Sequence, residues 1–401
     1  MTPTPSISPS EASRPAFPRL PFHLGGFPDS SAGAASSPGG AGLSSSSSTS
    51  TPISQNQLQQ QQQQQPHYSP HPPLRPSTYS AKDLILLHHA STSMPDAILG
   101  RGGTIYIIDI ALRYAIESPY LINQILAFAA LNLSHVQTDT SVKESLRHQA
   151  TELQTRALSD FKTETDYLTA LSSHQQQQQQ SDQQQQQDDA YHGVPRFLFA
   201  AILGLHVFAD TLLHHSLFPP ASNLPSFVAN FIDCLHLHRG VRTVLKPTWE
   251  GLLQTELGPL FSALSHATAT RQEGSECDGL LQFMAGAGSM NLDDESRAAC
   301  VEAAEHLQWG FDLSARLSEA EGPHAPSGVS VMFPGRFVDL LQQMQPLALV
   351  ILAYFGVLLH RSRRCWIFGD SGRFVIRAVA AHVGSAWEEP LRWPLQQLEK
   401  A

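Results

Sequence analysis

The chain has 401 residues, 41% of them hydrophobic and 15% charged, and its 35 acidic against 25 basic residues give a formal net charge of −10. Phosphate binding needs clustered Lys and Arg, so this balance argues against a surface dominated by nucleic-acid contacts. Four scattered cysteines with no C-x-x-C pair exclude a recognisable zinc finger and argue against a secreted disulfide framework.

We expect neither a signal peptide nor a membrane span. The N-terminus lacks the basic start and the apolar stretch of a secretion signal. The longest apolar run that we identify, 346–359, is shorter than the ~20 residues that crossing a bilayer requires. We therefore expect a protein of a reducing compartment, in which its four cysteines stay unpaired.

Residues 1–78 combine Pro, Ser, Gly and Gln with few apolar side chains, and include a serine run and a glutamine run. Such a segment buries too little apolar surface to offset the ~1–2 kcal/mol per residue that backbone ordering costs. We therefore expect this arm to be disordered.

Helical patterning begins near Tyr79. We expect short helices over 82–89 and 104–118. A third helix should start at Pro119 with Ser118 as its N-cap, because proline at the first helical position loses no hydrogen bond. In this third helix an apolar face repeats every four residues, at Leu121, Ile125, Ala129 and Leu133.

Ser141 and Glu144 have the spacing of a capping box and predict the start of a fourth helix. Its apolar positions follow at helical steps: Leu146, Ala150, Leu153, Ala157 and Phe161. A Gln-rich insert over 172–190 interrupts the pattern, and we expect a disordered loop there because a polar tract buries nothing. Helical patterning resumes over 195–215 and 227–246.

The C-terminal part begins with a Gly-rich and polar stretch, 266–291, that we expect to be a flexible loop. Asn291 or Asp293 can cap the next helix, which continues to near Leu317. Three more helices are predicted over 334–345, 346–360 and 371–383. No segment shows sustained strand alternation, so we expect a single all-α domain over 79–396 with nine or ten helices.

The sequence contains no evident catalytic or metal-binding pattern. Gly100 to Gly103 lacks the spacing of a phosphate-binding loop, and neither G-x-S-x-G nor H-E-x-x-H occurs. Neighbouring histidines such as His88 and His89 point apart on a helix, whereas metal pairs favour an i,i+4 spacing. A helical enzyme that uses Asp83, Asp109 or Asp210 is a weak alternative, since no paired carboxylates have a metal-holding spacing. We expect no enzyme, no catalytic residues and no cofactor or metal ligands.

The most specific part of the sequence is the C-terminal block. It reads Gln345-Pro-Leu-Ala-Leu-Val-Ile-Leu-Ala-Tyr-Phe-Gly-Val-Leu-Leu-His360, then Cys365-Trp366 and Gly369, and ends in Trp387-Glu-Glu-Pro-Leu-Arg-Trp-Pro394. This block resembles the end of the regulatory domain of fungal zinc-cluster transcription factors, especially the sterol uptake control protein group. That group has a similar Pro-x-Ala-Leu-x-x-Leu-Ala helix, a Trp/Gly turn and a closing Trp-Pro.

Upstream segments resemble the same group in a consistent order, so the resemblance covers roughly 80–396. They are Leu86-Leu-His-His89, Ser118-Pro-Tyr-Leu-Ile-Asn-Gln-Ile-Leu-Ala-Phe-Ala-Ala-Leu-Asn-Leu-Ser134, Arg147-His-Gln-Ala150 leading into Ala157-Leu158, and His238-Arg-Gly-Val241. The resemblance implies an all-α regulatory domain that senses a sterol-like ligand and controls transcription by RNA polymerase II in the nucleus. It also implies protein co-regulators and a homodimer as partners.

One departure from that family concerns DNA binding. The family carries a six-cysteine zinc cluster near its N-terminus, whereas the first cysteine here is Cys234, inside a predicted helix. We therefore expect no zinc cofactor and no direct DNA binding by this chain. A naturally shortened relative and a gene read without one exon both fit this departure.

The apolar helix over 346–359 needs burial on several sides, and a central core helix is its simplest interpretation. The resemblance suggests that it also walls a ligand cavity, in which rings and two polar handles would hold a flat apolar molecule. The candidate pocket residues are Phe337, Leu341, Met344, Leu347, Ile351, Tyr354, Phe355 and Trp366. The alternative is a protein-interaction scaffold or co-regulator with a filled core.

Two segments beside this helix have both a functional and a simpler interpretation. Gly369-Asp-Ser-Gly372 is a gate for the cavity or, more simply, an interhelical turn. Arg361-Ser-Arg-Arg364 is a nuclear-import element or phosphate contact or, more simply, a set of cations that complements a helix C-terminus. We favour the simpler interpretation of each.

Overall fold

The computed structural model describes residues 79–94, 107–115, 118–175, 182–216, 224–245, 252, 254–258, 274–286, 292–317 and 324–400. These residues belong to one compact unit. They form α-helices and one short 3₁₀ helix and contain no β-strand, which confirms the all-α prediction for this part of the chain. The arm expected over 1–78 lies outside the described residues.

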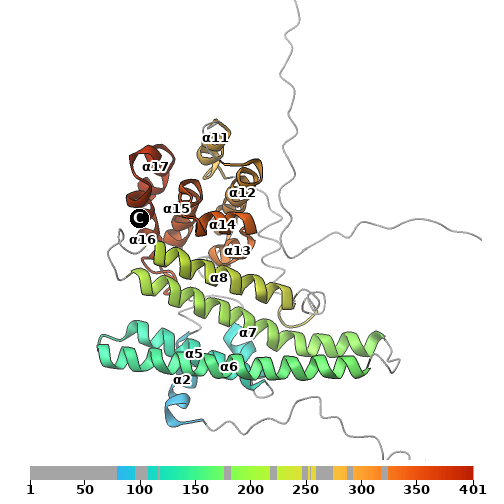
Figure 1. Cartoon of the computed structure of the whole chain (residues 1–401). Coiled ribbons are helices and arrows are strands. Elements are labelled where there is room, and N and C mark those ends of the chain that lie inside the picture. The colour runs from blue at the N-terminus through green and yellow to red at the C-terminus, as the bar shows by residue number, and fades with distance from the viewer. Residues whose placement is uncertain are drawn as a thin grey trace, which may run out of the picture. The chain divides into compact units, whose positions relative to one another are not determined.

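The N-terminal half contains six helices in the part of the chain described. They are α2 (Ala81–Thr92), α4 (Ile107–Tyr114), α5 (Pro119–Val136), α6 (Thr140–Gln175), α7 (Asp182–Ser216) and α8 (Leu224–Leu245). The buried helix α5 packs on α6, α7 and α2. Figure 1 shows α7 and α8 side by side. Helix α7 contacts α5, and α8 contacts helices of the C-terminal half, so this pair joins the N-terminal helices to the C-terminal ones.

Within the described ranges, the C-terminal half contains seven α-helices, of which α15 is central, and one 3₁₀ turn. They are α11 (Asp278–Gly286), α12 (Asp294–Arg316), α13 (His324–Met332), α14 (Gly335–Gln342), α15 (Pro346–Arg361), α16 (Ser371–Val383), η3 (Ser385–Trp387) and α17 (Glu388–Gln397). Every residue of α15 from Leu347 to His360 is buried. Helices α12, α13, α14, α16 and α17 all pack against it. This burial explains why α15 is apolar on every face.

Several predicted helix starts can be compared with the observed caps. Asp293 caps α12, and its carboxylate accepts from the Ser296 N–H at 2.7 Å, as predicted. Pro119 opens α5 as predicted, although the Ser118 side chain makes no capping hydrogen bond. The capping box at Ser141 is wrong: α6 begins one residue earlier, and Asp139 accepts from the Ser141 N–H at 2.8 Å. Aspartate competes well for this position because its carboxylate accepts from the free N–H groups of the first turn.

The Gln-rich insert over 172–190 is more helical than the sequence predicts. Helix α6 continues to Gln175 and α7 already begins at Asp182, so Pro195 lies inside α7 and not at its start. Residues 176–181 lie outside the described part. Glutamine is a fair helix former, and extending an existing helix avoids the unfavourable nucleation step. The residue composition of the insert does not show that a neighbouring helix can extend into it, so this helical structure was not predicted.

The expectation of a flexible loop over 266–291 is also wrong in part, because α11 occupies 278–286. Leu280 and Met284, one turn apart, are buried and hold this short helix against the fold. Two further helices, α13 and α17, were not predicted. In α17 the prolines Pro390 and Pro394 hid the helical pattern, since proline in a helix interior removes a hydrogen bond.

One stretch of the described residues, Gly193–Leu213 in α7, is long and apolar enough to cross a membrane by length and composition. Its mean hydropathy is 1.6, and 61% of it is buried inside the fold, as a core helix requires. Helices α14 and α15 are long and apolar enough to cross a membrane only when they are counted as one segment, and a bend of 107° separates them. Of these stretches, only the apolar run in α15 stands out in the sequence.

Candidate functional site

The eight candidate pocket residues do not line one cavity. Six of them are at most 2% exposed, whereas Met344 and Trp366 are half-buried. Phe337 and Phe355 both pack on Phe333, with ring centroids 4.9 and 5.6 Å from it. Phe355 also lies near the rings of Phe208 and Phe231, which extends the aromatic cluster to α7 and α8. These contacts describe a packed core between α14, α15, α7 and α8.

Two of the predicted polar handles face other directions. The Trp366 ring lies 5.3 Å from Phe128 of α5, away from the α14–α15 cluster. Tyr354 instead faces α17, where its ring stacks on Trp393 at a centroid distance of 5.0 Å. Its hydroxyl donates to the Pro390 carbonyl at 3.2 Å. Burial raises the pKa of Tyr354 above its ordinary value, so the hydroxyl keeps its proton and remains a donor.

Tyr354 forms the floor of a hollow of about 620 Å³ between α11 and α17. One face of α11 lines it, with Gly279, Gln282, Phe283 and Gly286, and one face of α17 lines the other side, with Glu389, Pro390, Arg392, Trp393 and Gln396. Both residue sets repeat at three- and four-residue steps, which is how one helix face meets another. This hollow is our candidate functional site.

The lining of the hollow combines polar and apolar surface in about equal parts. Phe283 and Trp393 contribute rings, whereas Gln282, Glu389, Arg392 and Gln396 contribute amide and charged groups. A Cβ built on Gly279 or on Gly286 meets no atom within 4 Å, so both positions border open space. Such a lining suits a ligand that has both an apolar and a polar part.

The N-terminal end of α11 is held by a set of polar contacts. Arg361 donates to Glu276 Oε1 at 3.0 Å, and Gln308 donates to Glu276 Oε2 at 3.0 Å and to Asp312 at 2.8 Å. The Cys277 N–H donates to the side-chain amide oxygen Oε1 of Gln308 at 2.8 Å. Burial raises the pKa of Glu276, but the hydrogen bonds from Gln308 and Arg361 outweigh it and the pKa lies below its ordinary value. Glu276 is therefore an ionised partner of Arg361 at neutral pH.

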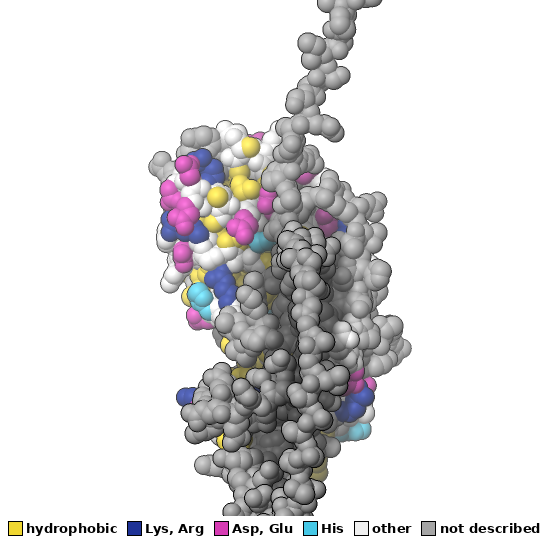
Figure 2. All heavy atoms as spheres, turned by 90° about the vertical axis from the view of Figure 1, so that its right-hand side faces the viewer, with side chains coloured by type: hydrophobic (Ala, Val, Ile, Leu, Met, Phe, Trp, Pro, Cys, Tyr) yellow, Lys and Arg dark blue, Asp and Glu magenta, His cyan; other side chains and the backbone are white. Residues whose placement is uncertain are grey.

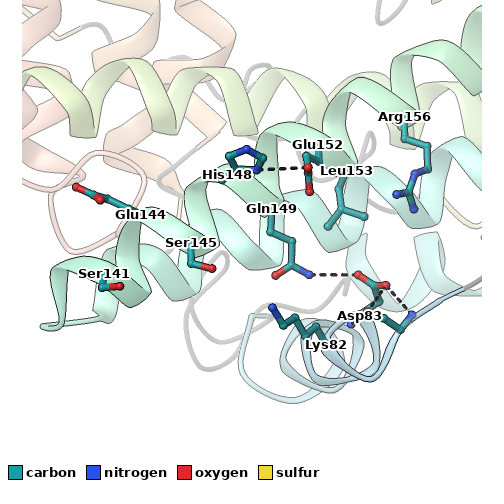
Figure 3. Close-up of a pocket in the computed structure, with 11 residues that line it drawn as sticks. Lys82, Asp83, Ser141, Glu144, Ser145, His148, Gln149, Glu152, Leu153 and Arg156 are labelled. Carbon is teal, nitrogen blue, oxygen red and sulfur yellow. Dashed lines mark hydrogen bonds and ion pairs between the residues drawn. The ribbon is translucent and has the colours of Figure 1, made fainter.

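A second hollow, of about 670 Å³, lies between α2 and the first half of α6. Figure 3 shows its polar lining, in which Asp83 accepts from Gln149 and from the Ser80 N–H, and His148 contacts Glu152. Acidic, basic and hydroxyl groups alternate around it without convergence on one point. It offers no arrangement that selects one kind of ligand.

The segments beside α15 follow their simpler interpretations. Arg361 pairs with Glu276 and lies 4.9 Å from the Phe311 ring centroid, while Arg363 donates to the His360 carbonyl at 3.0 Å. Arg363 therefore binds a carbonyl at the C-terminal end of α15, whereas Arg361 contacts other elements. Gly369 lies in the connection between α15 and α16 and adopts a left-handed φ of 43°, while Ser371 and Gly372 are the first residues of α16.

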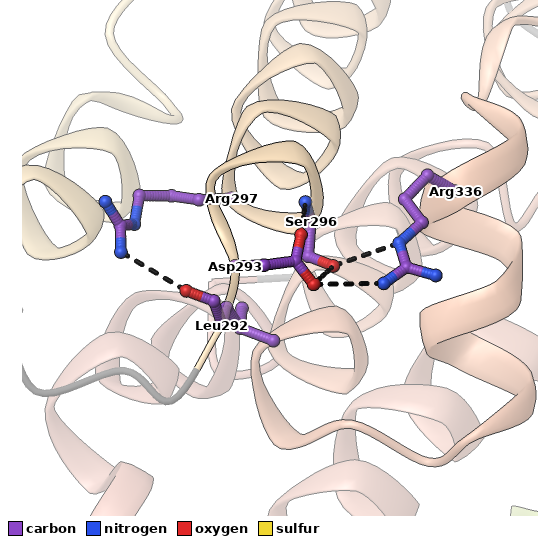
Figure 4. A network of polar contacts seen from close by, with 5 residues as sticks. All are labelled: Leu292, Asp293, Ser296, Arg297 and Arg336. Atoms are coloured by element: carbon purple, nitrogen blue, oxygen red, sulfur yellow. Dashed lines mark hydrogen bonds and ion pairs between the residues drawn. The ribbon is translucent and has the colours of Figure 1, made fainter.

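Another polar network joins the start of α12 to α14. Figure 4 shows Arg336 donating to Asp293 at 3.1 Å and to the Ser296 hydroxyl at 3.0 Å, while Arg297 donates to the Leu292 carbonyl. The Asp293 pKa is lowered, first by the hydrogen bond from the Ser296 N–H. This network fixes the helix end and does not line either hollow.

Within the described residues, no group of three or more His, Cys, Asp or Glu side chains is arranged to hold a metal ion. His88 is exposed, whereas His89 contacts Asn132 at 2.7 Å and His238 is buried near Ser330. On the face drawn in Figure 2, the coloured basic and acidic side chains are interspersed with apolar ones.

A comparison of the chain with known families, with curated proteins and with solved structures found no match in any of the three. Of the eight candidate pocket residues, Tyr354 lines this hollow, whereas its α11 and α17 lining residues were not predicted from the sequence. The signal was present in part: Gly279, Phe283 and Gly286 lie at helical spacing, but they occur in a stretch rich in glycine that we interpreted as a loop.

Proposed function

We propose that this helical domain is a transcription-regulator-like control domain that binds an apolar ligand such as a sterol in the hollow between α11 and α17. The resemblance to the regulatory domain of fungal zinc-cluster transcription factors suggests the biological role. It also suggests a nuclear location, protein co-regulators and a homodimer. The proposal contains no catalytic step and no metal or cofactor.

The observation that carries the proposal is the hollow itself. Its volume of about 620 Å³ falls within the roughly 300–1,000 Å³ of small-molecule sites. The stacked rings of Tyr354 and Trp393 form an apolar floor, and Gln282 and Arg392 offer polar groups at its edge. An apolar ligand gains about 25 cal/mol for each Å² of apolar surface removed from water, and the half-buried rings of Phe283 and Trp393 still have such surface to contribute.

Control requires that the ligand distinguish two states of the domain. A ligand shifts a conformational equilibrium only by the difference between its affinities for the two states. In our proposal, the occupied domain holds α11 and α17 at a different separation from that of the empty domain. The change alters the surface that a co-regulator meets.

A thermal titration with ergosterol tests the proposal. Ligand at about 100 times its dissociation constant stabilises a folded domain by about 2.7 kcal/mol, which corresponds to roughly 4–5 °C in melting temperature for a domain of this size. Gly279→Leu should reduce this rise because the leucine side chain occupies part of the hollow, whereas Gly279→Ala should retain it. A well-folded chain that gains no stability from ergosterol would refute sterol sensing.

A protein-interaction scaffold is the second candidate, and the dense packing around α15 favours it. Phe337, Leu341, Ile351 and Phe355 are all fully buried, so the α14–α15 region is a filled core. A scaffold would bind its co-regulator equally well with and without ergosterol. A co-regulator pull-down in which added ergosterol changes the bound fraction would exclude the scaffold.

A further inference from the structure

Both walls of the α11–α17 hollow are attached to the same helix. Tyr354 of α15 donates to Pro390 and thereby holds α17. Arg361, two turns further along α15, donates to Glu276 and thereby holds the start of α11. Because α15 is buried over nearly its whole length, it is a fixed frame for the two walls.

The start of α11 is held by more polar contacts than the rest of that helix. Glu276, Gln308, Asp312 and Arg361 form a connected set, which we call the anchor, and Gly274 adds an N–H bond to Asp312 at 2.9 Å. Arg361 lies at the exposed end of α15 and the Glu276 side chain is 21% exposed, so solvent reaches this pair. Charge-assisted hydrogen bonds with several partners are stronger than single contacts between neutral groups.

Beyond the anchor, α11 has few contacts. Leu280 and Met284 are its two buried side chains, and Phe283 meets Trp387 edge-on. On the side of the hollow, Gly279 and Gly286 border open space. Gly279 follows Glu276 by three residues, so the anchor and the first wall residue of the hollow lie within one helical turn. The position of α11 therefore depends strongly on the anchor.

We propose that the anchor couples the occupancy of the hollow to the C-terminal end of α15. A group that fills the hollow presses α11 away from α17, and this displacement changes the contact between Glu276 and Arg361. The ligand part of this statement rests on the proposed function, but the coupling itself is a property of the fold. Glu276 and Arg361 are thus positioning residues, and coupling through them is reciprocal: weakening the anchor changes binding as much as binding changes the anchor.

A double-mutant cycle tests the coupling without any ligand. Gly279→Leu places a bulky side chain in the hollow beside α11, and Glu276→Gln removes the charge that Arg361 meets while it keeps the side-chain shape. Urea unfolding of the full chain measures the unfolding equilibrium constant of each single variant and of the double variant. The change in this constant in the double variant should differ at least fivefold from the product of the changes in the two single variants. Agreement with the product within twofold would overturn the proposal. If Glu276→Gln does not fold, Arg361→Lys takes its place in the same cycle.

A matched control is available in the N-terminal half. Arg147 of α6 and Asp210 of α7 form an ion pair at 2.6 Å between helices that do not line the hollow. Asp210→Asn therefore removes one charge from a comparable pair. Combined with Gly279→Leu, it should act independently. A non-additive result of the same size in this control would show that the cycle detects general destabilisation and would overturn the proposal.

Ergosterol binding to the full chain separates this inference from the proposed function. Tryptophan fluorescence should report binding through Trp393, and Glu276→Gln should change the dissociation constant at least fivefold while Asp210→Asn leaves it unchanged. If wild-type protein binds no ergosterol but the cycle is non-additive, the proposed ligand is wrong and the coupling stands. If wild type and Glu276→Gln bind equally well and the cycle is additive, the coupling is wrong and ligand binding stands.

Discussion

Replacing Gly372 by alanine should break the closest contact between α15 and α16. Gly372 is the second residue of α16, and a Cβ built on it lies 2.8 Å from His360 Cα and nearer still to the Gly356 carbonyl oxygen and the His360 nitrogen. All three atoms belong to the backbone of α15, so no side-chain rotation relieves the contact. The two helices must separate until the distance reaches the 3.4–4 Å of ordinary contact.

The cost follows from what lies between these helices. Separation by at least ~0.6 Å loosens the packing of Val375, Ile376 and Val379, which are fully buried, and a gap of 0.5–1 Å forfeits a quarter to a half of the dispersion attraction. Overpacking of this kind costs about 1–3 kcal/mol, and we expect about 3 kcal/mol because backbone atoms are involved. For a domain of this size, that loss lowers the melting temperature by roughly 4–6 °C.

Gly279→Ala is the matched control, since it is the same chemical change in another helix. A Cβ at Gly279 meets nothing within 4 Å, and alanine in a helix is favoured over glycine by about 0.5–1 kcal/mol. We therefore expect opposite signs for one substitution at two positions. Urea unfolding of both variants measures the difference directly. A Gly372→Ala variant within about 0.5 kcal/mol of wild type would refute the close helix contact.

Two more predictions concern buried residues. Phe355→Ala should cost about 3–5 kcal/mol in urea unfolding, as expected for a ring in a packed core, and a loss under about 1 kcal/mol would show that Phe355 borders empty space. Burial lowers the pKa of His206 and of His306 to about 4 from 6.5. The folded state then resists protonation, so stability is complete above pH 6.5 and falls as the pH drops toward 4, by roughly 2 kcal/mol per histidine at pH 5. Unfolding midpoints at pH 7.5 and 5.0 check this loss; His306→Gln should make the pH dependence shallower, and an unchanged slope would contradict it.

Local sequence predicted where several helices begin and, for α12, which side chain caps it. Asp293 before α12 and Pro119 at the start of α5 act on groups within one helical turn, so they are visible in the sequence alone. The apolar run of α15 likewise predicted a central buried helix, because an all-round apolar helix has no stable place at a surface. The same local reasoning failed where two caps compete, and Asp139 displaced the expected cap at Ser141.

Only the tertiary structure decided which side chains share a site. The sequence placed Tyr354 and Phe355 in one pocket, yet adjacent residues on a helix face different neighbours: Phe355 packs into the α7–α8 core and Tyr354 lies under α17. Glu276 and Arg361 are far apart in the chain and carry no local signal of their contact. The hollow between α11 and α17 depends on how α11 packs on α12 and how α17 packs on α15, and the local sequence of either helix does not show this arrangement.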